Sequence, residues 1–334
     1  MSLEESIAHH VSEPSPARGR ATVIGAGVIG LTSALALARD GWTVTIVAQE
    51  AASASVSSVA GGIWFPYKAE ASERAQRLLD DSFREFVRLA TQVPESGVDL
   101  RSGTWVERLP GTDRSWAAAV PGVRRAPEDE VPLGALDALR AELPIVDMPT
   151  FLHWLEDECQ AEGIIPLQSK VRSPRDAAEL TGADLVVVAA GAGSGPLLGD
   201  FTGFPVRGQV VRLQQPGITH WLIDDDHPDG MIYVIPRRGD IVIGGTADDG
   251  EFDTEVNPEL QTALLARAVA AVPELAGLRV LSSAVGLRPA RPTLRLERFE
   301  SHGVPVVAAY GHGGAGVTLS WGTAAEVARL ARGE

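Results

Sequence analysis

The chain has 334 residues, of which 45% are hydrophobic and 22% charged, a composition ordinary for a globular protein. This length is sufficient for one large domain or two interleaved ones. Its formal net charge of −15 argues against binding nucleic acid through phosphates and gives no attraction to an acidic membrane surface. The single cysteine, Cys159, cannot form an internal disulfide, and neither a C-x-x-C motif nor a His/Cys cluster suggests a metal.

Residues 1–20 are polar and lack the apolar core of a signal peptide, so we predict a flexible N-terminal extension. No later stretch is long and apolar enough to span a bilayer. Residues 332–334 do not form a peroxisomal signal. The expected location is therefore the cytoplasm.

The most specific local pattern follows this extension. An apolar run at residues 21–24 predicts a strand, an alanine- and leucine-rich run at 31–39 predicts a helix, and G-x-G-x-x-G lies between them. This order suits a nucleotide pyrophosphate, because Gly25 permits the tight turn and Gly27 lets the backbone approach the phosphates. Gly30 lets helix and strand pack closely, and the helix N-terminus supplies N–H donors.

A second strand is predicted at residues 43–47 and is followed by Gln49 and Glu50. Glu50 is placed to accept hydrogen bonds from an adenosine ribose. The alternative is a glycine-rich turn without a ligand, which the complete strand–helix–strand context disfavours.

Two later segments have the same nucleotide-binding character. In residues 149–195 a helix precedes the very apolar run 184–193, which is typical of a strand buried on both faces of a parallel sheet. In residues 304–331 a short strand leads through the glycine-rich run 311–316 into a final helix. A second helix N-terminus is thus expected to point at a ligand.

The intervening segments differ in character. Residues 70–91 predict a long helix, and polar turns separate strands of an antiparallel kind at residues 100–110, 206–213, 231–236 and 240–246. We expect an α/β protein in which a Rossmann-type dinucleotide-binding domain is interleaved with an α+β substrate domain built on an antiparallel sheet. The predicted boundaries are residues 21–70, 149–205 and 282–334 for the first domain and residues 71–148 and 206–281 for the second.

Six motifs in this order resemble the D-amino-acid oxidase family of flavoproteins, which includes D-aspartate oxidase. The resemblance covers about residues 22–329. It rests on V-I-G-A-G-V-I-G-L at 23–31, A-G-G-I-W-F-P-Y at 60–67, R-G-Q-V at 207–210, Y-V-I-P at 233–236, G-L-R-P-A-R-P at 286–292 and Y-G-H-G-G-A-G-V-T at 310–318. It implies FAD, rather than a nicotinamide, in the Rossmann-type domain.

The resemblance makes Arg288, Tyr233 and Gly314 the candidate catalytic residues. A guanidinium fork matches a carboxylate with two parallel hydrogen bonds, and the family arginine matched by Arg288 binds the substrate α-carboxylate. The tyrosine matched by Tyr233 contacts the same carboxylate, although a strand tyrosine taken alone is more often core packing. The carbonyl matched by Gly314 accepts a hydrogen bond from the substrate amine. Arg291, the second arginine of its motif, is expected to be structural.

The expected cofactor contacts follow from the same motifs. The helix after Thr318 is expected to favour the negative charge that develops on the flavin pyrimidine ring, and His312 is expected to be a structural neighbour rather than a base. The hydroxyls of Ser55, Ser57 and Ser58 suit pyrophosphate or ribityl oxygens, but equally suit a solvated turn. The residues expected to hold FAD are Gly25, Ala26, Gly27, Val28, Ile29, Gly30, Glu50, Ser57, Ser58, Gly62, Ile63, Trp64, Val171, Arg288, Gly313, Gly314, Gly316, Val317 and Thr318.

The reaction implied by the resemblance is oxidative deamination of a D-amino acid. Hydride transfer to flavin N5 gives an imino acid that hydrolyses to a 2-oxo acid and ammonia, and oxygen reoxidises the flavin to give hydrogen peroxide. The expected partners are a small D-amino acid and oxygen, and a homodimer is a family-level expectation. The alternatives are a D-aspartate oxidase, a glycine- or sarcosine-type amine oxidase, a flavin dehydrogenase with another acceptor, and a non-catalytic dinucleotide-binding protein.

Local departures from the family bear on the ligands. Residues 224–231 lack the lid tyrosine of mammalian members, and their acidic run is expected to be a solvated loop, although it would repel an anionic side chain. Arg237 and Arg238 would favour D-aspartate if they faced the substrate, but an exposed turn is the favoured interpretation. Glu50 stands where the family often has a basic residue after an acid, so a different ribose contact is expected. We expect neutral D-amino acids to be preferred.

Overall fold

The computed structural model describes residues 18–66, 72–301 and 303–334. Its strands are β1 (Gly19–Ile24), β2 (Trp42–Ala48), β3 (Val98–Glu107), β4 (Arg124–Arg125), β5 (Asp137–Val146), β6 (Ile165–Gln168), β7 (Leu185–Val188), β8 (Phe204–Gln214), β9 (Trp221–Asp224), β10 (Ile232–Pro236), β11 (Asp240–Gly244), β12 (Asp248–Asp249), β13 (Val280–Ser301) and β14 (Val304–His312). They form one sheet in the order β4-β5-β3-β9-β10-β11-β8-β13-β14-β7-β1-β2-β6, with β12 paired to β8.

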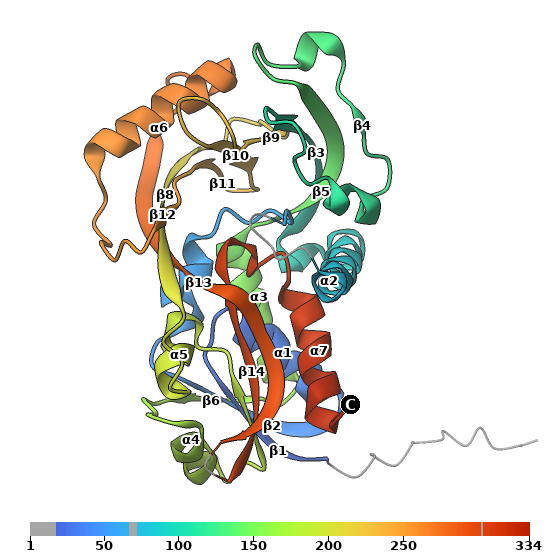
Figure 1. Ribbon diagram of the computed structural model, residues 1–334, viewed down its shortest axis with the longest axis vertical. Helices are drawn as coiled ribbons and strands as arrows, with labels where there is room; N and C mark the ends of the chain where they lie inside the picture. Colours follow the sequence, from blue (N-terminus) through green and yellow to red (C-terminus); the bar gives the residue numbers. More distant parts are fainter. Residues whose placement is uncertain (1–17, 67–71, 302) are drawn as a thin grey trace, which may run out of the picture.

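The helices are α1 (Val28–Arg39), α2 (Glu73–Gln92), α3 (Met148–Ala161), α4 (Pro174–Thr181), α5 (Ser194–Leu197), α6 (Pro258–Ala271) and α7 (Ser320–Arg332). Within the described ranges, none of them combines the length and apolar character needed to cross a membrane. Figure 1 shows α1, α3 and α7 beside the lower part of the sheet and α6 at the far end of the upper part.

The lower half of the sheet is parallel, because β14, β7, β1, β2 and β6 pair in that order with the same direction. β7 is buried along its whole length, which explains its purely apolar sequence. Its alternate residues Leu185 and Val187 join the core beneath α1 and α7, whereas Val186 and Val188 join a second core with α4. Because successive side chains of a strand point to opposite faces, β7 packs against helices on both faces of the sheet.

The upper half of the sheet is mainly antiparallel, as the sequence predicts, with β8 pairing to β11 and β10 to β9. One pair departs from the expectation, because β9 runs parallel to β3 through Gly103–Trp105 and Trp221–Ile223. α6 covers one face of this half: its buried Leu264 and Ala268 pack in a core with residues of β8, β10 and β11.

Two elements connect the halves. α2 begins with Ser72, whose hydroxyl accepts the N–H of Ala75 at 3.1 Å, and it buries an apolar face that includes Phe83 and Phe86. Its Ser82 hydroxyl accepts the N–H of Gly322 in α7 at 2.8 Å. β13 pairs with β8 over its first half and with β14 over its second, so one strand belongs to both parts of the sheet.

The expected α/β class with a Rossmann-type unit is confirmed. The sequence analysis predicted neither α6 nor the 22-residue β13, and the proposed boundary at residue 282 falls inside β13. The division into two domains stays a prediction. The N-terminal extension is described only from residue 18, and Tyr67 of the second family motif lies outside the described residues.

Candidate active site

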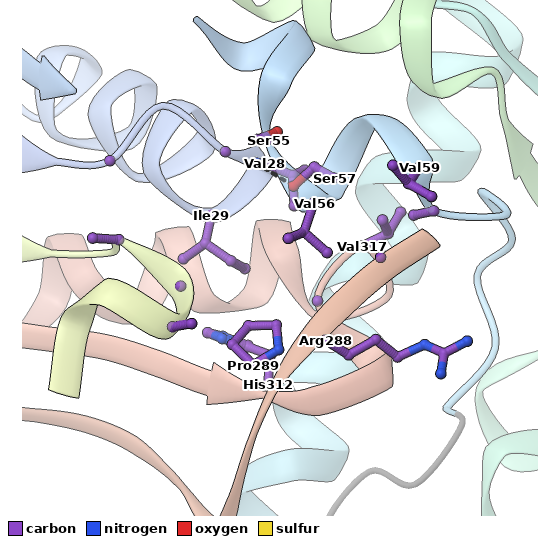
Figure 2. Close-up of a pocket in the computed structure, with 18 of the residues that line it drawn as sticks. Val28, Ile29, Ser55, Val56, Ser57, Val59, Arg288, Pro289, His312 and Val317 are labelled. Carbon is purple, nitrogen blue, oxygen red and sulfur yellow. Dashed lines mark hydrogen bonds between the residues drawn. The ribbon is translucent and has the colours of Figure 1, made fainter. Parts of the chain in front are cut away.

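A cavity of about 820 Å³ extends from the N-terminus of α1 to the strands β10 and β13. This volume lies in the upper part of the ~300–1,000 Å³ range of small-molecule sites. Figure 2 shows Val28, Ile29, Ser57 and Val56 on one wall and Pro289, His312 and Arg288 on the opposite wall. The cavity is therefore bounded by the glycine motif on one side and by β13 and β14 on the other.

The glycines of the G-x-G-x-x-G motif have the expected steric roles. Gly25 has φ +116°, and a side chain there would collide with the carbonyl of Ala189 at the end of β7. A side chain at Gly30 would collide with the carbonyl of Gly25, which explains how α1 packs so closely on β1. A Cβ at Gly27 would lie 3.3 Å from the Ser57 hydroxyl, at the place where the backbone faces the cavity.

The three candidate serines have different environments. Ser57 faces the cavity, and its hydroxyl accepts the N–H of Val28, the first residue of α1, at 3.1 Å. The Ser55 hydroxyl donates to the Ala52 carbonyl at 2.6 Å and also borders the cavity. The Ser58 hydroxyl donates to the Ser55 carbonyl at 2.8 Å, and Ser58 is not part of the cavity wall. Ser57 is thus the serine best placed to share the helix N-terminus with an anion.

The expected adenosine end also lies on the cavity wall. Glu50 follows β2, and Val171 follows β6, the strand that pairs with β2. Lys170 and Arg172, on either side of Val171, border the same region and were missed because no motif marks them. Both are exposed, and they add positive charge to the part of the wall that contains Val171.

Arg288 and Tyr233 meet at the other end of the cavity. The Arg288 guanidinium donates to the Thr246 carbonyl at 2.8 Å, and a side chain at Gly208 would collide with it. Figure 2 shows this side chain extending from β13 away from His312. Side chains at Gly244 or Gly245 would collide with the Tyr233 ring. Glycines therefore make room for both groups.

The electrostatics keep this pair in the forms that bind a carboxylate. Burial raises the pKa of Tyr233, and the charge and hydrogen bond of Arg288 partly oppose that rise. The phenol consequently stays protonated and able to donate. The two side chains present a cation and a hydroxyl donor together, the combination that recognises a carboxylate.

The loop after β14 forms the wall between the two ends of the cavity. Gly313, Gly314, Gly316, Val317 and Thr318 all line it. The Thr318 hydroxyl donates to the Phe65 carbonyl at 2.8 Å, which ties this loop to the segment after η2 (Val56–Val59). Gly62 and Ile63 also line the cavity.

His312 lies on the wall but is fully buried, and burial lowers its pKa to about 4. One of its ring nitrogens, Nε2, lies 3.0 Å from the Thr323 hydroxyl in α7. The imidazole is therefore neutral at physiological pH and engaged with a helix. This arrangement agrees with the expectation of a structural neighbour rather than a base.

Of the residues expected to hold the cofactor, Gly30, Ser58 and Trp64 are not part of the cavity wall. Gly30 packs α1 on β1, as described above. Trp64 is fully buried, with its ring centroid 4.8 Å from that of Phe83 in α2. Alternation along the chain explains this placement, because Ile63 and Phe65 border the cavity while Trp64 points into the core.

Two expectations about charged loops are wrong in part. Asp224 is buried and accepts a bidentate ion pair from Arg108, with Nε and Nη2 distances of 2.9 and 2.7 Å, and Asp225 lines the cavity. Asp226, Pro228 and Asp229 of residues 224–231 are exposed, as expected of a solvated loop. Arg237 is not in an exposed turn, because it is 1% exposed and bonds both oxygens of Asp240 at 2.6 Å.

The other arginines in question are structural. Arg238 pairs with Asp99 at 2.8 Å, and neither it nor Arg237 lines the cavity. Arg291 pairs with Asp200 at 2.9 Å, as expected for a structural arginine. Asp200 also accepts the Tyr310 hydroxyl at 2.6 Å. The first ion pair joins the turn between β10 and β11 to β3, and the second joins β13 to the loop after α5.

A Rossmann-type sheet with a glycine-rich turn lies at one end of the cavity, and an arginine and a tyrosine lie at the other. This arrangement is typical of an oxidoreductase that holds a dinucleotide. Residues 20–330 match the family model described as "FAD dependent oxidoreductase" (DAO). The chain belongs to this family, and its cofactor is FAD.

Named relatives cover nearly the whole chain. It is 42% identical to a D-amino-acid oxidase of Rubrobacter xylanophilus over 93% of this chain and 95% of that protein. It is also 42% identical to a D-amino-acid oxidase of Streptomyces coelicolor over 94% of this chain and 97% of that protein. A human D-aspartate oxidase is 32% identical over 93% of this chain and 94% of that protein.

The fold also matches solved structures. A glycine oxidase from Bacillus cereus superposes with a TM-score of 0.77, covering 95% of both chains at 22% identity. At this identity the likeness concerns the fold.

Proposed function

We propose that the protein catalyses oxidative deamination of D-amino acids with oxygen as the electron acceptor. The balanced reaction converts a D-amino acid, oxygen and water into a 2-oxo acid, ammonia and hydrogen peroxide. The observation that carries this proposal is the Arg288–Tyr233 pair at the end of the cavity away from the phosphate-binding turn. The relatives named as D-amino-acid oxidases support the choice of substrate class.

In this proposal Arg288 holds the substrate α-carboxylate by a bidentate interaction, and the Tyr233 hydroxyl donates a further hydrogen bond to it. The Gly314 carbonyl accepts a hydrogen bond from the α-amine. When the carboxylate and the amine are both held, only one enantiomer can direct its α-hydrogen into the cavity while its side chain lies along the wall. Bound FAD supplies the two-electron acceptor for this hydrogen.

The protein contributes orientation and exclusion of water rather than a side-chain base. The neutral, buried His312 supports this view, because its imidazole is already engaged with Thr323. Thr318 lines the cavity two residues before α7 begins at Ser320, and the positive end of this helix dipole would favour negative charge that develops nearby.

The wall near Tyr233 supports an aliphatic side chain on the substrate. Phe65, Ile223, Met231 and Ile235 line the cavity there. The D-aspartate alternative requires a cation beside the substrate side chain, and the arginines considered for that role, Arg237 and Arg238, lie elsewhere, as described above. The expected homodimer rests on the family resemblance, and size-exclusion chromatography tests it. The cytoplasmic location stays a prediction from the sequence.

The visible spectrum of the purified holoenzyme tests the proposal. Under anaerobic conditions D-alanine is expected to bleach the oxidised-flavin absorption, whereas L-alanine leaves it unchanged. Admitting air should restore the absorption with one equivalent of hydrogen peroxide. Bleaching by both enantiomers, or by neither across a series of neutral D-amino acids, would contradict the proposal. Recovery that requires a dye instead of oxygen would indicate a dehydrogenase.

A further inference from the structure

The end of β9 directs successive acidic side chains to opposite sides of the sheet. Ile223 and Asp225 line the cavity, whereas Asp224 between them lies outside it and pairs with Arg108. Ile223 and Asp224 alternate with the period of two of an extended strand, and Asp225, the first residue of the turn after β9, lies on the cavity side again. The ion pair between Asp224 and Arg108 is buried, with 4% and 8% side-chain exposure, so it fixes which face Asp225 takes.

The neighbouring strands place Asp225 in the substrate end of the cavity. Ile223 is the register partner of Tyr233 in β10 and of Trp105 in β3, so all three side chains lie on the same face of the sheet. Trp105 lies close enough to Asp225 for its indole N–H to lower the pKa of that carboxyl, and it packs on Phe65 with ring centroids 6.5 Å apart. Asp225 therefore lies at an aromatic and aliphatic wall, on the Tyr233 side of the site.

The proposed function leaves Asp225 without a task. Arg288 and Tyr233 hold the α-carboxylate. The α-amine donates to the carbonyl of Gly314, which lies in the loop after β14, and β14 belongs to the other half of the sheet. Glu50, another carboxylate on the wall, lies at the adenosine end. Asp225 is thus an acidic group beside the space left for the substrate side chain.

We infer that Asp225 is a specificity-determining residue, favouring D-amino acids whose aliphatic side chain ends in an ammonium or guanidinium group. This inference rests on the proposed function and refines its substrate class. The stem of such a side chain lies along Ile223 and Met231, and its cation pairs with the carboxylate. An anionic side chain is disfavoured by the same group.

The charges around Asp225 support this role. Burial raises its pKa to about 7, repulsion from Asp226 and Asp224 adds to the rise, and the Trp105 hydrogen bond opposes it. Among the described residues no lysine or arginine contributes an opposing charge to this carboxyl. A substrate cation would supply the missing partner, and a desolvated pair of this kind is stronger than one in water.

The test compares two substrates of similar length that differ in charge. The kcat/KM values of the holoenzyme are measured for D-lysine and D-norleucine, in the wild type and in Asp225→Asn. The carboxamide keeps the size of the side chain and an acceptor for Trp105. Asp229→Asn, in the exposed part of the same loop, is the matched control.

We expect the D-lysine to D-norleucine ratio to fall about ten- to a hundredfold in Asp225→Asn and to stay unchanged in Asp229→Asn. The kcat/KM for D-norleucine should change less than about threefold. In the wild type the ratio should rise with pH as Asp225 ionises near pH 7. The titratable groups that act on Asp225 are Asp224 and Asp226 on its own segment. Tyr233 on β10 lies within electrostatic reach of Asp225, and Arg288 on β13 acts on Tyr233 rather than on Asp225.

Equal losses for both substrates would overturn the inference, because they would place the α-amine rather than the side chain at Asp225. An unchanged ratio would overturn it as well. If Asp225→Asn does not fold with FAD, Asp225→Ser and the wild-type pH dependence of the ratio provide the same discrimination. Failure of the proposed function is recognised separately, because D-norleucine then fails to reduce the wild-type flavin at all.

Discussion

Asp225 makes the stability of the protein depend on pH in a way that does not require catalysis. Its pKa is raised from an ordinary 3.8 to about 7, so the folded state keeps a proton that the unfolded chain releases. Below about pH 4 both states are protonated and the group has no effect. As the pH rises towards 7 the folded state loses stability relative to the unfolded state. The full decrease in the free energy of unfolding is reached above about pH 7.

The magnitude follows from the pKa difference. A change from 3.8 to about 7 corresponds to at most about 4 kcal/mol, and the remaining solvent contact of this half-buried side chain reduces it to about 2 kcal/mol. Asp225→Asn removes the ionisation while keeping the shape. The free energy of unfolding of the variant should therefore exceed that of the wild type by about 2 kcal/mol at pH 8, and by much less at pH 4.

Chemical denaturation of the FAD-saturated proteins at pH 4, 6 and 8 measures this difference. Asp229→Asn serves as the control, since its side chain is exposed in the same loop. A stabilisation that is equal at pH 4 and pH 8 would refute the reasoning, because it would owe nothing to ionisation. A destabilised Asp225→Asn at pH 8 would show that the carboxylate has a favourable partner in the folded state.

Three further substitutions test the site and its supports. Arg288→Lys replaces a fork by a point charge, so kcat/KM for D-alanine should fall about 10²-fold or more with retained flavin absorption; a fall below tenfold would contradict carboxylate binding by this residue. Gly30→Ala should drive α1 away from the Gly25 carbonyl and weaken FAD binding, measured by flavin fluorescence; wild-type affinity would contradict the packing argument. Arg108→Met leaves Asp224 buried without its ion pair and should lower the free energy of unfolding, measured by chemical denaturation, by about 3–5 kcal/mol. A decrease under about 1 kcal/mol would contradict the importance of this ion pair.

The nucleotide-binding half was predictable because its determinants are local. Strand, glycines and helix at residues 21–39 follow each other without interruption, so the pattern is recognisable without knowledge of distant partners. The apolar β7 was recognised for the same reason. The family motifs then located Arg288, Tyr233 and Gly314, all of which the fold brings to one cavity.

The parts that escaped prediction depend on partners distant in sequence. Nothing local distinguishes Asp225 from Asp226; their different environments follow from the pairing of β9 with β3 and β10 and from Arg108, 116 residues away from Asp224. Arg237 lies in a polar segment whose sequence is typical of a turn, yet tertiary packing buries its side chain. Lys170 and Arg172 reach the cavity only because β6 pairs with β2.

The shared strand β13 has a consequence for how a substrate is admitted. Arg288 lies in the stretch of β13 that is laddered to β8, and a few residues later the same strand is laddered to β14, which leads into the loop with Gly314. A hinge between the two halves of the sheet would have to break these ladders. The spacing between the proposed carboxylate and amine contacts is consequently set by an unbroken backbone. Entry of a substrate therefore depends on motions of loops and side chains at the rim of the site.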